Sequence, residues 1–201
     1  MNRSNEKSRA AYDKKADDYD NTPDGRFTRK FKHLLVSEIR LNPGCNVLDV
    51  ACGNGSLLAA MNKQTPMKGF GVDISGQMIK NASVNHPAME FHVAGCEALP
   101  FQNNTMDIIT VCAAYHHFPD TAAFAGEAER VLVPKGKLYI AEIYLPSVLR
   151  WICNPFVPLS NAGDVRLYSP KEIANNFKTF GFEETDVKIS DHIQIVSLQK
   201  L

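Results

Sequence analysis

The stretch NVLDVACGNGSLLAAM, Asn46 to Met61, joins a short apolar run to two closely spaced glycines and then to a second apolar run. NVLDV is a continuous apolar run of the kind found in strands that are buried on both faces. SLLAAM, which follows the glycines, predicts the start of a helix. The stretch therefore predicts a strand, a tight loop and a helix.

The alternation of strand and helix continues on both sides of this stretch. Apolar residues at helical spacing predict a helix from about Arg26 to Arg40. Further expected strands are KGFGVD, AMEFHVA, MDIITVCAA and GKLYIAEI, and further expected helices are SGQMIKNASV and DTAAFAGEAERVL. Such alternation implies a parallel sheet with helices on both faces.

The C-terminal end departs from this alternation. SPKE, Ser169 to Glu172, has the Ser, Pro and Glu of a helix start, and Gly181 is expected to end that helix. Two alternating segments follow, Phe182 to Ile189 and His192 to Gln199, with a hairpin turn expected at Ser190-Asp191. The prediction is an α/β fold with a doubly wound, mostly parallel seven-stranded sheet and an antiparallel C-terminal strand.

Composition narrows the functional class. The chain has 201 residues, and its 22 Lys plus Arg balance 22 Asp plus Glu, so no basic surface is expected to bind nucleic acid. Its five cysteines include no CxxC pair, which predicts neither disulfides nor a zinc site; we expect no metal and a cytoplasmic location. The polar first twenty residues do not resemble a signal peptide. Arg150 and three prolines within Ile143 to Leu159 argue against stable membrane insertion.

The glycine loop predicts a nucleoside-bearing cofactor. Gly53 and Gly55 permit close approach of a ligand to the backbone, and Asp73, 20 residues after Gly53, suits a carboxylate that accepts hydrogen bonds from ribose hydroxyls. Leu58 stands where a dinucleotide fingerprint requires its third glycine. Asp49 would repel a pyrophosphate but tolerate the cationic methionine part of S-adenosylmethionine. The residues thus favour an adenosyl cofactor and leave an NAD(P)-dependent oxidoreductase as the alternative.

Seven segments in the same order resemble class I S-adenosylmethionine-dependent methyltransferases of the small-molecule type, the methyltransferase type 11 group that includes ubiquinone and menaquinone biosynthesis methyltransferases. They are YDKKADDYD, VLDVACGNG, GVDIS, CEALPF, MDIITVCAAYHHFPD, ERVLVPKGKLYIAE and YSPKEIANNFKTFGF. The resemblance implies a Rossmann-like fold, with S-adenosyl-L-methionine as cofactor and S-adenosyl-L-homocysteine as product. It also implies one domain over 1–201: lid and helix (1–40), cofactor-binding core (41–142), substrate-loop insertion (143–168), and C-terminal helix and hairpin (169–201).

The resemblance implies a set of cofactor-binding residues. Asp73 corresponds to the ribose acid, Ile74 packs on adenine, and Cys112 and Ala113 line the methionine end. Gly95 stands where the family usually has an acid, so Glu97 or backbone groups are expected to replace that contact with adenine. The full set is Tyr12, Tyr19, Asp49, Ala51, Cys52, Gly53, Gly55, Asp73, Ile74, Met78, Cys96, Glu97, Ala98, Cys112, Ala113 and His117.

Methyl transfer from a sulfonium is a one-step displacement that needs alignment more than a catalytic set. His116 or His117 could act as general base, and Tyr19 with Tyr12 could form a lid at the reacting groups. Alternatively, the histidines order their loop and the tyrosines pack. Glu142 is expected either to touch a substrate or to be a strand-end acid in solvent.

The expected function is methyl transfer to a small molecule. The apolar segment Ile143 to Leu159, with Trp151 and Phe156, favours an acceptor that is at least partly apolar. CAAYHHFPD lacks the Asn/Asp-Pro-Pro-aromatic arrangement associated with methylation of nucleic-acid amines. A cofactor-binding protein without transferase activity, acting through a partner, is a further alternative. We expect no nucleic-acid partner and a monomer or homodimer.

Overall fold

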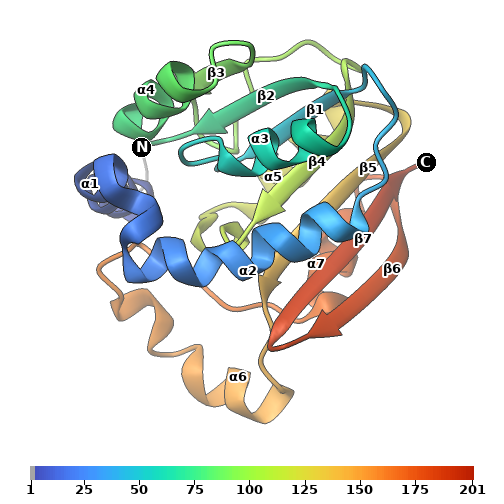
Figure 1. The fold of residues 1–201 in the computed structure, drawn as a ribbon. Helices are drawn as coiled ribbons and strands as arrows, with labels where there is room; N and C mark the ends of the chain where they lie inside the picture. Colours follow the sequence, from blue (N-terminus) through green and yellow to red (C-terminus); the bar gives the residue numbers. More distant parts are fainter. Residues whose placement is uncertain (1–2) are drawn as a thin grey trace.

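Seven strands form one sheet in the computed structural model, which describes residues 3–201 (Figure 1). Their order across the sheet is β3-β2-β1-β4-β5-β7-β6. The strands are β1 (Asn46–Val50), β2 (Lys68–Asp73), β3 (Glu90–Val93), β4 (Met106–Cys112), β5 (Leu132–Ile143), β6 (Phe182–Ser190) and β7 (Ile193–Lys200).

Strands β3, β2, β1, β4 and β5 pair in parallel, whereas β7 is antiparallel to both β5 and β6. This confirms the expected mostly parallel sheet with an antiparallel C-terminal strand. The chain winds outward from β1 in one direction through β2 and β3 and in the other through β4 and β5. In open α/β sheets such a switch of direction leaves a crevice beyond the carboxyl ends of the strands.

Helices cover both faces of this sheet (Figure 1). The α-helices are α1 (Arg3–Lys15), α2 (Pro23–Glu38), α3 (Ser56–Gln64), α4 (Gly76–Asn85), α5 (Thr121–Val131), α6 (Ser147–Cys153) and α7 (Pro170–Lys178). Short 3-10 helices are η1 (Ala16–Asn21), η2 (Tyr115–His117) and η3 (Val157–Leu159). Helices α2 and α3 pack on one face, and α5 and α7 pack on the other.

The direction of successive side chains along β1 explains why most residues of this strand are apolar. Val47 packs with α2 and α3, while Leu48 and Val50 pack in the cluster that includes α5 and α7. Because successive side chains of a strand point to opposite faces, a strand covered on both faces needs apolar residues at nearly every position. The glycine loop is therefore fixed between a buried strand and the buried helix α3.

Several details differ from the predictions, including the start of β5 at Leu132 rather than Gly136. Helix α2 begins at Pro23, earlier than predicted, because the Thr22 side chain accepts a hydrogen bond from Gly25 N at 3.1 Å and Pro23 is well suited to the first turn. The hairpin turn lies at Asp191-His192, and both residues have left-handed φ angles, of 48° and 62°. The segment expected as a binding loop contains α6, which projects from the sheet and its helices (Figure 1).

Among the residues that the structure describes, no helix combines the length and the apolar character needed to span a membrane.

Candidate functional site

A cavity opens where the winding direction of the sheet switches, beyond the carboxyl ends of β1, β2 and β4. Its empty volume, including the part open to solvent, is about 710 Å³. Five chain segments supply its walls: α1 with η1, the glycine loop, the segment after β2, the segment after β3, and the segment after β4. The lining residues are Asn5, Ser8, Tyr12, Tyr19, Val50, Ala51, Gly53, Asp73, Ile74, Met78, Ala94, Cys96, Glu97, Cys112, Ala113, Ala114, His117 and Phe118.

The glycine loop brings its backbone to the cavity wall. Gly53 and Gly55 have left-handed φ angles of 53° and 76°, which glycine adopts without steric cost. A Cβ atom on Gly55 would lie 2.9 Å from the ring of Phe91, so the loop also needs a glycine for space. Ala51 and Ala113 line the cavity with φ angles of 61° and 51°, which are strained for alanine. Such strain often accompanies functional sites, so these two strand ends are candidates for contact with a ligand.

Asp73 ends β2 and faces both the glycine loop and the cavity. Its carboxylate accepts hydrogen bonds from Gly53 N and Ser75 N, each at 2.9 Å. Burial raises the pKa of this carboxyl group. Since both backbone contacts hold it in place, Asp73 presents a pre-oriented acceptor that fits the ribose hydroxyls of an adenosyl group.

Asp49 lies behind the loop, among the described residues that do not line the cavity. Thr110 Oγ1 donates a hydrogen bond to its carboxylate at 2.7 Å, and burial raises the pKa of Asp49 to about 7. Cys52, Gly55 and Ala98 also lie outside the lining, whereas the other predicted cofactor residues belong to it. The predicted cofactor-binding set therefore contains two kinds of residue: those that line the cavity and those that lie behind the lining.

Helix α1 covers the cavity and is held by contacts with distant segments. Asp13 Oδ1 accepts hydrogen bonds from Ser75 Oγ at 2.6 Å and from Gln77 N at 3.2 Å, at the start of α4. On its other side, Ser8 Oγ donates to Ala162 O at 2.8 Å. Asn5 and Ser8 precede the segments that resemble the family, so nothing in the sequence singled them out.

Glu97 occupies the space beside Gly95. A Cβ atom on Gly95 would lie 2.5 Å from Glu97 Oε2, so a larger residue at this position would displace the carboxylate. Asn5 Nδ2 donates a hydrogen bond to Glu97 Oε1 at 3.1 Å. The Glu97 carboxylate therefore lies next to the Gly95 backbone, beside the cavity that both α1 and Glu97 line.

His116 is buried and paired with Glu142. Glu142 Oε2 accepts hydrogen bonds from His116 N at 3.0 Å and from His116 Nδ1 at 2.8 Å. Burial disfavours the charged form of each group, but their mutual attraction outweighs it, raising the pKa of His116 and lowering that of Glu142. Glu142 is 0% exposed, so its reading as a strand-end acid in solvent is wrong. His116 lies outside the described lining of the cavity.

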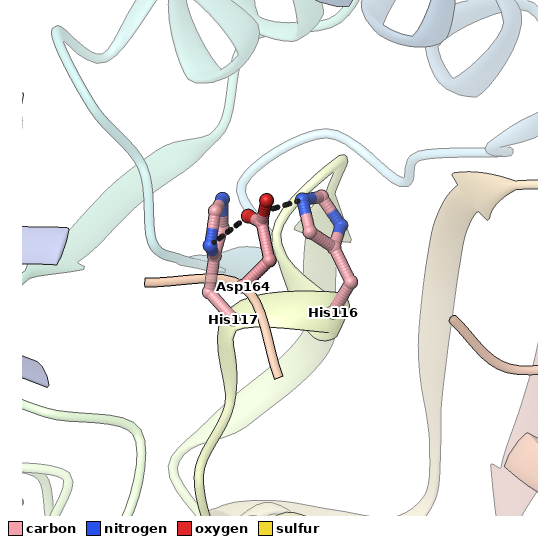
Figure 2. A group of neighbouring side chains, drawn as sticks. All are labelled: His116, His117 and Asp164. Carbon is pink, nitrogen blue, oxygen red and sulfur yellow. Dashed lines mark ion pairs between the residues drawn. The ribbon is translucent and has the colours of Figure 1, made fainter. Parts of the chain in front are cut away.

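His117 lines the cavity and lies between two polar groups. Its Nε2 lies 3.0 Å from Tyr12 Oη, and its Nδ1 lies 2.9 Å from Asp164 Oδ1. Burial and the charge of His116 lower the pKa of His117. Asp164 also lies 3.6 Å from His116 Nε2, so this carboxylate stands between the two imidazoles (Figure 2). No sequence motif indicated Asp164, which belongs to the segment after α6.

Tyr115 and Arg166 have structural contacts. Tyr115 is fully buried, and its hydroxyl accepts a hydrogen bond from Asn176 Nδ2 at 3.0 Å. Arg166 is exposed and pairs with Glu172. The centroids of the Tyr12 and Tyr19 rings lie 6.1 Å apart, and both residues line the cavity. The two rings therefore pack near each other and are also placed to contact a ligand.

A glycine loop, a strand-end acid and a covering helix at the switch point of a parallel sheet define a nucleoside-cofactor enzyme of the Rossmann-like class. Residues 48–140 match the family model described as a methyltransferase domain. The chain is 29% identical over 183 residues to the demethylmenaquinone methyltransferase of Thermotoga maritima, covering 79% of each chain. It is 32% identical over 126 residues to the ubiquinone/menaquinone biosynthesis C-methyltransferase of Geotalea uraniireducens, covering 59% of this chain and 54% of that protein.

The Thermotoga alignment is long, but the Geotalea alignment spans about half of its protein, and one to the Chlorobaculum parvum demethylmenaquinone methyltransferase spans 42%. Among solved structures, a chain from the complex of a Haloferax volcanii methyltransferase activator with a methyltransferase superposes with a TM-score of 0.81 at 18% identity, covering 94% of this chain and 96% of that one. An S-adenosylmethionine-dependent methyltransferase from Aquifex aeolicus gives 0.71 at 20% identity, covering 94% and 98%. Identities this low show the fold alone.

The chain thus contains a methyltransferase domain over residues 48–140 and is similar to S-adenosylmethionine-dependent methyltransferases, so its cofactor is S-adenosylmethionine. These matches favour the methyltransferase prediction over the oxidoreductase alternative.

Proposed function

We propose that the protein transfers a methyl group from S-adenosylmethionine to a small, partly apolar acceptor by direct in-line displacement. The observation that carries this proposal is the cavity itself, in which the glycine loop and Asp73 form one side and Tyr12 and His117 form another. The cofactor supplies a methyl group that is already activated by its positive sulfur. The protein has to hold the two reactants in line and exclude water, which the covering helix α1 suits.

The cavity walls support the proposed cofactor contacts. Asp73 would accept hydrogen bonds from ribose hydroxyls, and the apolar side chains of Ile74 and Met78 would pack beside the adenine. Glu97 would replace the family's usual acid near the adenine, because its carboxylate fills the space that Gly95 leaves open. Cys112 and Ala113 would line the methionine end. These assignments use residues that line a single continuous cavity.

The predicted general-base role is proposed for His117. Its ring lines the cavity, and its lowered pKa keeps the imidazole neutral near pH 7, the state in which it can accept a proton. His116 donates hydrogen bonds to Glu142, and we propose that it positions the segment after β4 rather than acting as the base. Because a phenol or an acidic carbon becomes a better nucleophile when it loses its proton, this arrangement suits an acceptor of that kind.

An apolar acceptor is supported by the segment between β5 and α7. Six apolar side chains stand exposed on α6 and near η3, with Trp151 79% exposed: Val148, Leu149, Trp151, Ile152, Phe156 and Leu159. The same segment continues to Ala162, which contacts α1. Relatives of the chain are named for quinone precursors, which are acceptors of the same apolar class. Cytoplasmic location and a monomeric or dimeric state remain predictions.

The proposal is tested by incubating the protein with methyl-labelled cofactor and two acceptor sets. One set holds quinols and phenols with apolar tails, and the other holds charged, water-soluble phenols and amines. We expect label in the apolar set, and a loss of about 100-fold or more in turnover for His117→Gln. His92→Gln, an exposed histidine paired with Glu90, is the matched control and should keep full turnover.

Label only in charged acceptors would contradict an apolar substrate. Cofactor binding without label in any acceptor, including cell extracts, would instead favour the cofactor-binding protein without transferase activity.

A further inference from the structure

Three ligand-type side chains converge beside the cavity. His116, His117 and Asp164 each offer one atom, and these atoms all lie within 4.8 Å of one another (Figure 2). The histidines are neighbours in η2, whereas Asp164 comes from the segment after α6. Two imidazole nitrogens and a carboxylate oxygen form a donor set found in zinc and iron enzymes.

We propose that His116 Nε2, His117 Nδ1 and Asp164 bind a divalent transition-metal ion such as Zn²⁺. The sequence-based expectation of no metal rested on the cysteines, and this donor set contains none.

Outer contacts orient both imidazoles toward this site. Glu142, which is ionised and fully buried, accepts a hydrogen bond from His116 Nδ1 at 2.8 Å, so that Nε2 is the nitrogen left to face Asp164. Tyr12 Oη lies 3.0 Å from His117 Nε2, so that Nδ1 is the nitrogen that faces Asp164. A carboxylate behind a metal-ligating histidine is the usual arrangement in metal sites, because it fixes the ring and makes the ligand more basic.

His117 Nδ1 supplies a second, independent observation. Within residues 3–201 this buried atom has no hydrogen-bond partner, although it lies 2.9 Å from a carboxylate oxygen. The contact is close enough for an ion pair. Buried polar atoms are rarely left in this state. A cation between the imidazole and the carboxylate would satisfy both groups.

Charge favours a divalent ion at this place. Asp164 and Glu142 bring two carboxylates to two imidazoles; Glu142 is fully buried and Asp164 is partly exposed, and negative charge inside a protein is costly unless it is balanced. A doubly charged ion with neutral imidazoles balances both carboxylates. Imidazole ligands select zinc, iron and related ions over Mg²⁺ and Ca²⁺, which prefer oxygen. Three protein ligands also leave a coordination position open for water or an acceptor oxygen.

The position of the site suggests what the ion does, an inference that rests on the proposed function. His117 also lines the cofactor cavity, so the ion would border the acceptor. A metal-bound hydroxide would take the proton of an acceptor O–H or C–H bond and become metal-bound water. The electron pair left on the acceptor would form the bond to the methyl carbon as the carbon–sulfur bond of the cofactor breaks. With the ion bound, His117 supports the base as a ligand.

Calorimetric titration of chelator-treated protein with Zn²⁺ and with Mg²⁺ tests the site. We expect one Zn²⁺ per chain, no comparable Mg²⁺ binding, and Zn²⁺ affinity reduced by about 100-fold or more in Asp164→Asn. Glu142→Gln keeps all three proposed ligands and changes only the side chain that orients His116. We expect this variant to lose about 10- to 100-fold in Zn²⁺ affinity. His92→Gln should bind Zn²⁺ like the wild type. Thermal melts and S-adenosylhomocysteine binding show whether each variant is folded.

Absence of stoichiometric Zn²⁺ binding, or unchanged affinity in folded Asp164→Asn, would overturn the site. Replacement of Zn²⁺ by Co²⁺ gives a second readout, since a sulfur-to-cobalt charge-transfer band would mean that one of the free cysteines holds the ion instead. S-adenosylhomocysteine binding and label transfer without any Zn²⁺ would refute the proposed role of the ion in catalysis and leave the proposed function standing. Zn²⁺ binding without label transfer to any acceptor would refute the proposed function and leave the metal site standing.

Discussion

Asp49 shows how a residue in the binding motif can act from behind the loop. Its carboxyl group is buried between β1 and β4 and has Thr110 as its hydrogen-bond partner. Burial raises its pKa from 3.8 to about 7, although Thr110 and the charge of Lys32 oppose the rise. The folded state therefore keeps this proton to a higher pH than the unfolded chain does.

Replacement of Asp49 by Asn should change how stability depends on pH. The wild-type group favours folding fully below about pH 4, and this contribution is lost as the pH rises through about 7. The amide introduced by Asp49→Asn would keep the contact with Thr110 and has no charge to bury. At pH 8 we therefore expect a melting temperature at least about 3 °C above wild type, with the difference vanishing near pH 4.

Melting curves from pH 4 to 8 measure this effect, with Asp191→Asn in the exposed β6–β7 turn as the control. An equal fall in stability with pH in wild type and Asp49→Asn would show that the carboxyl group is not the one responsible.

At the residue scale, the sequence anticipated the groups that lie on motifs. Spacing led to Gly53 and Asp73, and the family resemblance led to Tyr12 and His117; all four line the cavity. Asp164 could not be found this way, because it lies 47 positions after His117 in a segment without a motif. Only the fold brings its carboxylate between the two imidazoles.

At the element scale, α7 has the start that its sequence predicted. Ser169 Oγ accepts a hydrogen bond from Glu172 N at 3.2 Å, and Glu172 Oε2 accepts one from Ser169 N at 2.8 Å. Local rules suffice here, because both partners lie within one turn of helix. They were insufficient for α6, since its apolar residues and the prolines on either side of it, Pro146 and Pro155, fit a loop and a short helix equally well.

Ser169→Ala should destabilise the protein by about 1 kcal/mol, because the amide of Glu172 loses its acceptor at the helix start. Urea unfolding monitored by circular dichroism measures this difference. Ser83→Ala is the matched control, since Ser83 lies inside α4, where its hydroxyl bonds to Ile79 O and Ala is a good helix former. Equal stability of wild type and Ser169→Ala would mean that the capping box contributes nothing to α7.

At the scale of the whole molecule, the sheet could be predicted from the sequence, whereas the docking of α1 over the cavity could not. Alternating strands and helices fix the parallel order through short right-handed connections, which leaves few topologies to choose from. The docking of α1 depends on contacts between distant positions, such as Ser8 with Ala162, 154 residues apart. No local pattern encodes such a contact, yet it helps to hold α1 at the cavity that Asn5, Ser8 and Tyr12 line.

Calorimetric titration of S-adenosylhomocysteine into wild type and Asp73→Ala, with NADH as the comparison ligand, tests whether the cavity binds the adenosyl cofactor through Asp73. Asp73 presents the acceptor assigned to the ribose, and loss of hydrogen bonds to a charged group weakens binding by about 10-fold or more. We expect micromolar binding of S-adenosylhomocysteine that weakens to this extent in the folded variant, and no NADH binding. Failure of the wild type to bind S-adenosylhomocysteine, or equal binding by Asp73→Ala, would contradict this expectation.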